Sequence, residues 1–130
     1  MLLVRTTTVT SPSKTDPDPA RGEVWWIRFD PSDGSEVQKT RPAVVVNVAS
    51  VGRLPLRIVV PTTGWDQKWA TVPWLVYLKK TTRNGLDKDS AADCFQVKSV
   101  SLGRFVSRVG VLAADEIEQI AAAVAICVGA

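Results

Sequence analysis

The sequence predicts a mainly β chain folded as a small, strongly bent barrel, with a single helix at the C-terminal end. From residue 23 onward, short apolar and β-branched runs alternate with turn residues such as Asp, Pro and Gly. Near the C-terminus, the apolar residues change to a helical spacing. At 130 residues, 45% of them hydrophobic, the chain has the length of one domain with one core.

Six apolar runs are expected to form strands, and their even spacing between turns indicates a small barrel. They cover residues 24–29, 42–48, 56–60, 71–78, 90–97 and 103–109. The run 42–48 reads PAVVVNV, and such a continuous apolar run is typical of a strand buried on both faces. Pro61 is expected to end the third strand.

The last segment is predicted to be an amphipathic helix that packs against the barrel and ends at Gly129. Its apolar stripe follows the spacing i, i+3, i+4, i+7 and i+11 and comprises Ile117, Ile120, Ala121, Val124 and Val128. The helix dipole favours negative charge in the first turns, where the sequence has Asp115, Glu116 and Glu118. This acidic cluster therefore has a structural explanation.

The composition changes at residue 20. Residues 1–20 are rich in Thr, Ser, Pro and Asp, and the run DPDP at 16–19 is incompatible with a helix or a central strand. We expect residues 1–20 to form a flexible arm and residues 21–130 to form the folded domain. No apolar run reaches the roughly 18 residues of a membrane span, and residues 1–20 lack the pattern of a secretory signal. A cytoplasmic protein is therefore expected.

The chain has no histidine and only two cysteines, Cys94 and Cys127. The absence of histidine excludes Ser-His-Asp and Cys-His catalysis and removes the commonest zinc ligand. The two cysteines are expected to be buried, inert thiols, because both lie in apolar surroundings. Any chemistry must therefore use Arg, Lys, Thr, Ser, Asp or Glu. Trp74 and Tyr77 are expected to lie in the core or in a dimer interface.

The positive charge is concentrated in the body of the chain. Residues 21–112 contain 14 Lys and Arg against 8 Asp and Glu, although the net charge of the whole chain is only +3. This distribution is compatible with a polyanionic partner such as a nucleic acid.

Three segments contain the candidate functional residues. In the first, a polar loop with Glu36 and Lys39 leads into the strand that begins with Arg41 and Pro42. Proline biases the preceding residue towards an extended conformation, so the Arg41 guanidinium is expected to project from a rigid strand end and to bind phosphate oxygens. The alternative interpretation is a surface arginine paired with a carboxylate such as Glu36.

The second and third segments are a hydroxyl-rich turn and a polar strand end. The run VPTTG at 60–64 places Thr62 and Thr63 beside backbone N–H groups that can bind an anionic phosphate, but it also fits an ordinary turn. In the third segment, Gln96 alternates with apolar neighbours, and its amide can read a base edge or simply cap the strand.

Together these segments resemble the MazF/PemK family of toxin–antitoxin ribonucleases, which share an SH3-like barrel. The stretches that resemble the family are RGEVW at 21–25, FDP at 29–31, GSE at 34–36, TRPAVVV at 40–46, VPTT at 60–63, and Asp93 with QVKS at 96–99. The resemblance covers the chain from about residue 21 to its end. Two departures are the insertion of Cys94 and Phe95 before Gln96 and the glycine-free loop at 37–40.

The resemblance implies a homodimeric endoribonuclease that cuts single-stranded RNA by attack of the ribose 2′-OH, without a metal or cofactor. The family's catalytic arginine and threonine correspond to Arg41 and Thr63. Glu36 is a candidate for the base, and the alternative is that it only orients the loop that carries Arg41. The expected RNA-binding residues are Lys39, Thr40, Thr62, Trp65, Lys68, Trp69, Gln96 and Lys98. The expected partner is an antitoxin with an acidic tail. The alternatives are a CcdB-like gyrase inhibitor and a catalytically silent RNA-binding barrel.

Overall fold

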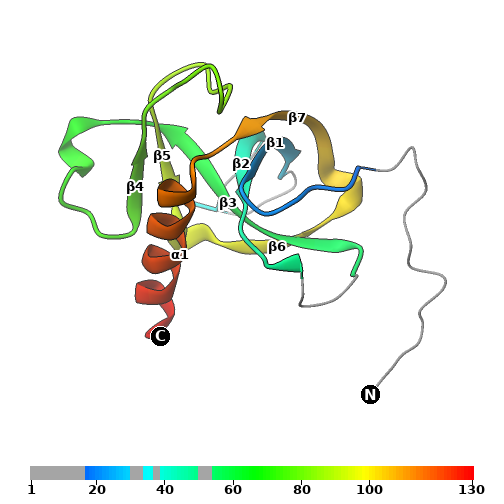
Figure 1. The fold of residues 1–130 in the computed structure, drawn as a ribbon. Coiled ribbons are helices and arrows are strands. Elements are labelled where there is room, and N and C mark those ends of the chain that lie inside the picture. The colour runs from blue at the N-terminus through cyan, green and yellow to red at the C-terminus, as the bar shows by residue number, and fades with distance from the viewer. Residues whose placement is uncertain (1–16, 30–33, 37–38, 50–53) are drawn as a thin grey trace.

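The computed structural model describes residues 17–29, 34–36, 39–49 and 54–130. Within these ranges seven strands precede one long helix, so the predicted mainly β chain with a C-terminal helix is confirmed (Figure 1). The strands are β1 (Glu23–Arg28), β2 (Thr40–Val45), β3 (Leu56–Gly64), β4 (Leu75–Leu78), β5 (Ser90–Asp93), β6 (Lys98–Ser101) and β7 (Phe105–Val111). The helix is α1 (Ala114–Val128), and short 3₁₀ turns form η4 (Gln67–Trp69), η5 (Cys94–Gln96) and η6 (Leu102–Arg104).

All the strand pairs are antiparallel, and β3 connects the two parts of the bent sheet. The strands lie in the order β4-β5-β3-β2-β1-β7, and β6 pairs with β3 beside this path. One edge of β3 pairs with β6 over residues 56–59 and then with β5 over residues 62–64. The strand therefore passes from one part of the sheet to the other, which gives the fold its barrel-like bend.

The prediction that Pro61 ends the third strand is wrong, because β3 continues to Gly64. Pro61 is fully buried and lies opposite Ala43 of β2. A proline cannot donate to a strand ladder, so it is tolerated where a ladder is interrupted. Pro61 lies between the residues of β3 that pair with β6 and those that pair with β5, so the ladder on that edge of β3 is interrupted at this proline.

Other strand limits also differ from the predicted ones. The strand predicted at 42–48 is Thr40–Val45, because Asn47 uses its side-chain oxygen, at 3.0 Å, to accept from the N–H of Ile58. Residues 71–74 form turns in place of the first half of the strand predicted at 71–78. The strand predicted at 90–97 ends at Asp93, whose carboxylate caps η5. The strand predicted at 103–109 is Phe105–Val111, and β6 was not predicted.

The core consists of two apolar clusters on opposite faces of β2 and β3. Val44 and Val60 belong to the cluster that includes α1, whereas Ala43, Val45 and Val59 pack with the side chains of β1 and β7. All five side chains are at most 1% exposed. The predicted burial of this strand on both faces is confirmed, and it fixes the direction in which each residue at the strand ends points.

Helix α1 lies along β4 and η5 and covers the first cluster. Ile117 and Ile120 of the predicted stripe are buried, but Val128 is 68% exposed because it lies in the last turn. Glu116 caps the start of the helix by accepting from the N–H of Ala113 at 3.0 Å, which confirms a structural role for this acidic residue. Gly129 ends the helix in the left-handed conformation, with φ 74°.

The loop between β4 and β5, residues 79–89, is held rigidly by one buried side chain. Asn84 is 1% exposed, and its side-chain oxygen accepts from the N–H groups of Thr81 and Leu86 at 3.0 Å each. Its amide nitrogen donates to the Lys79 carbonyl at 2.9 Å. The loop packs so closely on β7 that a Cβ at Gly110 would collide with the Asn84 backbone. The position of this loop is therefore fixed by packing and hydrogen bonds.

The residues before β1 are also attached to the sheet where the structure describes them. Arg57 of β3 donates to the Pro19 carbonyl at 2.8 Å and pairs with Asp18 at 3.0 Å. The rest of the predicted arm, residues 1–16, lies outside the described residues. No helix within the described ranges is both long and apolar enough to cross a lipid bilayer.

Cys94 is expected to resist thiol reagents in the folded protein. Its side chain is fully buried, and burial raises the pKa of the thiol to about 12. The reactive thiolate is therefore absent at pH 8. The folded pKa of Cys94 is above the usual value of 9.0. The contribution of this thiol to the free energy of unfolding is therefore complete below about pH 9, and it is lost as the pH rises towards 12.

Mass spectrometry after iodoacetamide treatment at pH 8 measures this reactivity. Cys94 should stay unmodified in the native protein and react fully in denaturant. The half-buried Cys127 is the internal comparison and should react faster in the native state. Equal native rates for the two cysteines would contradict the predicted burial effect.

Candidate active site

The strand register places Arg41 and Thr63 side by side at the open end of the β2–β3 pair. Ala43 lies opposite Pro61, and continuing this register by two residues brings Arg41 opposite Thr63 on the same face. Both side chains line one cavity of about 600 Å³. β2 begins with Thr40 and Arg41, and β3 ends with Thr63 and Gly64, beyond the buried valines of both strands. The side chains of Arg41 and Thr63 therefore lie at the edge of the core.

The two neighbouring threonines have different environments, although both border the cavity. Thr62 is 4% exposed, and its hydroxyl donates to the Pro42 carbonyl at 2.7 Å. Thr63 is half-buried and projects from the opposite face of β3. Thr62 therefore links β2 to β3, whereas Thr63 presents its hydroxyl beside Arg41.

Most of the sequence-predicted site residues come together around this cavity. Its lining includes Glu36, Lys39, Arg41, Thr62, Thr63, Trp69 and Gln96. The loop residues Val37 and Gln38 lie outside the described residues. Lys39 has a positive φ of 66°, a conformation that costs energy for a residue with a side chain and is often found next to functional sites.

Sequence reasoning missed several residues of the lining. Gly34, Ser35, Pro61 and Asp93 lie in the candidate stretches but were not named as site residues, and Trp74 and Leu75 lie outside those stretches. Strand alternation explains three of them: Asp93 pairs with Leu75, and both lie on the face that Pro61 shares with Thr63. This signal requires the order of the strands, which a single sequence does not provide.

Asp93 and Gln96 form one polar unit at the wall of the cavity. The amide nitrogen of Gln96 donates to Asp93 at 3.1 Å, and the other carboxylate oxygen accepts from the N–H of Phe95 at 3.2 Å. The residues inserted between Asp93 and Gln96 form the turn η5, which returns Gln96 to the cavity. The insertion that separates this chain from the family pattern therefore keeps the two polar side chains together.

Three further hollows adjoin the cavity and contain most of the remaining predicted residues. Lys98 lines a hollow of about 560 Å³ beyond Gln96, and its ammonium lies 6.0 Å from the centre of the Phe29 ring. Thr40 lines one of about 390 Å³ that shares Arg41 and Thr63 with the cavity. Trp65 lines one of about 630 Å³ that shares Thr63 and Trp69.

Lys68 is the exception among the predicted RNA-binding residues. It is not among the residues that line these four hollows. Its ammonium instead pairs with Asp66 at 3.8 Å on the surface. The helical turn η4 directs Trp69 towards the cavity and leaves the Lys68 side chain 72% exposed.

The aromatic residues of this region form an exposed cluster. Trp74 and Tyr77 are 40% and 44% exposed, so neither lies in the core, and their predicted place in a dimer interface stays a prediction. β4 is an edge strand, and its alternating residues Val76 and Leu78 take the core positions. Trp74 packs edge-to-face on Phe95 at 5.9 Å, and Tyr77 packs on Trp65 at 4.9 Å.

The site has the chemistry of an anion-binding, acid–base centre. Arg41 and Lys39 supply positive charge, Thr63 supplies a hydroxyl donor, and Glu36 and Asp93 supply carboxylates. Within the described ranges, no group of three or more Cys, Asp or Glu side chains is placed to hold a metal ion.

Comparison with known proteins gives the family. Residues 20–128 match the family model described as PemK-like, MazF-like toxin of type II toxin–antitoxin system. The chain is 35% identical over 106 residues to Endoribonuclease MazF9 of Mycobacterium tuberculosis, a match that covers 77% of this chain and 87% of the relative.

Solved structures share the fold. MazF of Deinococcus radiodurans superposes with a TM-score of 0.74 at 22% identity, covering 88% of this chain and all of that one. A mycobacterial endoribonuclease solved in complex with its cognate antitoxin superposes with a TM-score of 0.67 at 16% identity, covering 86% of this chain and 96% of that one. The match over residues 20–128, together with the identity to the M. tuberculosis relative, shows that this chain belongs to the PemK-like, MazF-like family of toxins of type II toxin–antitoxin systems.

Proposed function

We propose that this chain is a toxin endoribonuclease that cleaves single-stranded RNA, mRNA in particular, at specific sequences, with residues 21–130 as the catalytic domain. The observation that supports this most strongly is that Arg41 and Thr63, from neighbouring strands, line one open cavity. The M. tuberculosis relative is named an endoribonuclease, which agrees with the proposal.

The reaction that fits these side chains uses the substrate's own nucleophile. The 2′-oxygen of a ribose attacks the adjacent phosphorus, the bond from phosphorus to the 5′-oxygen breaks, and the products are a 2′,3′-cyclic phosphate and a 5′-hydroxyl. Arg41 stabilises the charge that develops on the phosphate oxygens and delivers a proton to the leaving oxygen. Thr63 donates a hydrogen bond to the same phosphate. This step needs no metal and no histidine.

Glu36 is proposed as the base that removes the proton of the 2′-OH. The cavity has two carboxylates, but both oxygens of Asp93 already accept hydrogen bonds, from Phe95 and Gln96. Glu36 lies on the exposed segment 34–36, where a substrate can reach it. Asp93 therefore orients Gln96, and Glu36 is the better candidate for proton transfer.

Replacing Glu36 with glutamine should lower the rate of RNA cleavage by about a hundredfold, because a general base contributes at least this factor. It should also remove the fall in rate at low pH that protonation of the base causes. Asp93→Asn is the matched variant and should retain that acidic limb. Single-turnover rates between pH 4 and 8 measure both variants, and an unchanged acidic limb in Glu36→Gln would exclude Glu36 as the base.

The residues around the reacting phosphate are proposed to bind the RNA on both sides. Gln96 is proposed to read a base edge, with Lys98 beyond it to contact a phosphate. Lys39, Thr40 and Thr62 border the phosphate site, and Trp65 and Trp69 offer surfaces on which unpaired bases can stack. Lys68 keeps a peripheral role, because it is paired with Asp66.

The proposed setting is cytoplasmic, with a homodimer as the active form and an acidic antitoxin as the inhibitor. The mycobacterial structure with its cognate antitoxin supports the antitoxin. Competition for a basic groove is the physical reason that an acidic tail would inhibit, since carboxylates can occupy the phosphate site at Arg41.

Incubation of the purified protein with a long in-vitro transcript tests the enzyme class. Discrete RNA fragments that end at a shared sequence support the endoribonuclease. A CcdB-like inhibitor would leave the RNA intact and block DNA supercoiling by gyrase, and a silent binding module would only retard the RNA on a gel. Either of these results would overturn the proposal.

A further inference from the structure

We propose that the hollow beside Thr63 is a second RNA-binding site, in which Lys80 and Lys88 bind a phosphate next to the one that is cleaved. The inference rests on the proposed endoribonuclease function and extends it to the backbone of the flanking nucleotide. It concerns two lysines that the family resemblance did not identify.

The position of Lys88 is the first argument. Its side chain passes over Gly64, because a Cβ built on that glycine would lie 3.2 Å from the Lys88 ammonium and 3.3 Å from its Cε. Gly64 directly follows Thr63 in β3. Lys88 also lines the two hollows that share Thr63 with the reaction cavity. Lys88 therefore lies at the end of β3, beside the residue that follows Thr63, and borders hollows that Thr63 also borders.

The shape of the hollow is the second argument. It measures about 630 Å³ and continues from the cavity through the shared residues Thr63 and Trp69. Lys80 and Lys88 line it together with the indole of Trp65. Cations beside aromatic rings are the combination that binds single-stranded nucleic acid, because phosphates pair with the cations and bases stack on the rings.

The carboxylates of the hollow are already engaged. Asp89 accepts from the N–H of Lys80 at 2.9 Å and from the Tyr77 hydroxyl at 3.1 Å, and the hydrogen bond from Lys80 lowers its pKa. Asp66 accepts from the N–H of Lys68 and pairs with its ammonium. Among the described residues, none of the ion pairs involves Lys80 or Lys88. The charge of Lys80 also lowers the pKa of Asp89, so this carboxylate attracts the Lys80 ammonium without forming an ion pair with it. Both ammonium groups thus keep donors for an external phosphate.

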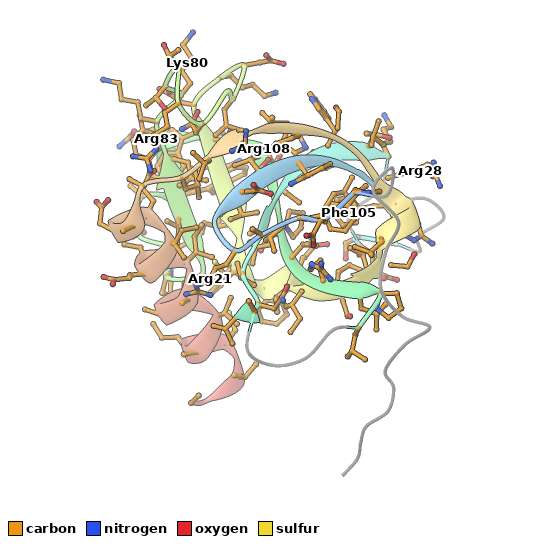
Figure 2. The ribbon with its side chains drawn as sticks, turned by 45° about the vertical axis from the view of Figure 1, so that its right-hand side comes forward. Arg21, Arg28, Lys80, Arg83, Phe105 and Arg108 are labelled. Atoms are coloured by element: carbon orange, nitrogen blue, oxygen red, sulfur yellow. The ribbon has the colours of Figure 1, made fainter. Side chains whose placement is uncertain are left out.

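The rigidity of the loop is the third argument. Lys80 and Lys88 belong to the loop 79–89 that Asn84 holds in place, and this loop leaves the sheet at the end away from the C-terminus of α1 (Figure 1). Figure 2 shows Lys80 and Arg83 at that same end of the molecule. A fixed loop loses little conformational entropy on binding, so its cations are pre-organised for a polyanion.

The test compares the double variant Lys80→Gln/Lys88→Gln with Lys79→Gln, which removes one charge from the same loop outside the hollow. The probe is a fluorescent single-stranded RNA with 2′-O-methyl riboses, which cannot be cleaved because it has no free 2′-OH. Fluorescence anisotropy at several salt concentrations gives the slope of log K against log salt. The loss of one neutralised phosphate should reduce the magnitude of this slope by about 0.7 in the double variant. Lys79 does not line the hollow, although its charge lowers the pKa of Asp89, so Lys79→Gln should reduce the slope by clearly less per charge than the double variant.

Single-turnover cleavage of an unmodified transcript is measured in parallel. The protein concentration for half-maximal cleavage should rise more in the double variant than its plateau rate falls. If the wild type cuts RNA and the double variant keeps the wild-type slope, the second site is wrong and the proposed function stands. The site is also overturned if each charge removed lowers the slope equally in the double variant and in Lys79→Gln. That result would show only a general effect of charge. If the wild type cuts no RNA, it is the proposed function that fails.

Discussion

Replacing Arg41 with alanine is expected to lower the rate of RNA cleavage by at least about a hundredfold, because one donor to a developing oxyanion contributes about a hundred- to a thousandfold. Arg41 lines the same cavity as Thr63, and its planar guanidinium matches the oxygens of a phosphate. Arg41→Lys should recover only part of the loss, since an ammonium keeps the charge but lacks the planar fork that binds two phosphate oxygens. Single-turnover rates with saturating protein measure the chemical step of each variant.

A folding control is needed, because Arg41 lies within β2. The thermal unfolding midpoint of Arg41→Ala should stay close to that of the wild type, as the side chain lies at the rim of the cavity and outside both core clusters. Cleavage at the wild-type rate by a folded Arg41→Ala protein would show that this residue takes no part in the reaction.

The second large effect separates the two adjacent threonines. Thr63→Val should lower the cleavage rate by about a hundredfold or more with little change in stability, because valine removes the hydroxyl and keeps the shape. Thr62→Val should have the opposite profile. Its buried hydroxyl donates to the Pro42 carbonyl in a part-buried hydrogen bond, so its loss costs about 1 kcal/mol of the free energy of unfolding.

Urea unfolding and single-turnover cleavage on the same two variants measure this separation. The pair is matched, since both substitutions change one hydroxyl into one methyl group on neighbouring residues of β3. If Thr62→Val loses activity and Thr63→Val does not, the reacting hydroxyl belongs to Thr62. That result would contradict the placement of the site on the Thr63 face of β3.

The strands with the strongest apolar pattern could be predicted from the sequence, whereas the positions at which strands change partner could not. Val44 and Val45 and the stripe at Ile117 and Ile120 have one stable solution, which is burial, and the structure confirms their strand and helix. Pro61 was expected to end a strand because local propensity does not show that β3 exchanges β6 for β5 at this point. That exchange depends on tertiary pairing.

The candidate site shows the same division. Arg41 and Thr63 were identified because they lie in recognisable stretches, and the register then places them on one face. Asp93, Trp74 and Lys88 are distant in sequence and meet the site only through the order β4-β5-β3-β2. Trp74 was expected in the core or in a dimer interface, but it lies in the turn before β4 and is 40% exposed, which excludes the core.

The central claim is that the Arg41–Thr63 site cuts RNA through the substrate's own 2′-OH and without a metal. The most direct test is cleavage in excess EDTA of two RNAs that differ only by a 2′-deoxy ribose at the mapped cleavage position, followed by analysis of the product ends. The account predicts that the all-ribose RNA is cut to a 2′,3′-cyclic phosphate and a 5′-hydroxyl, and that the 2′-deoxy RNA stays intact. Cleavage of the 2′-deoxy RNA, or cleavage that stops in EDTA, would contradict it.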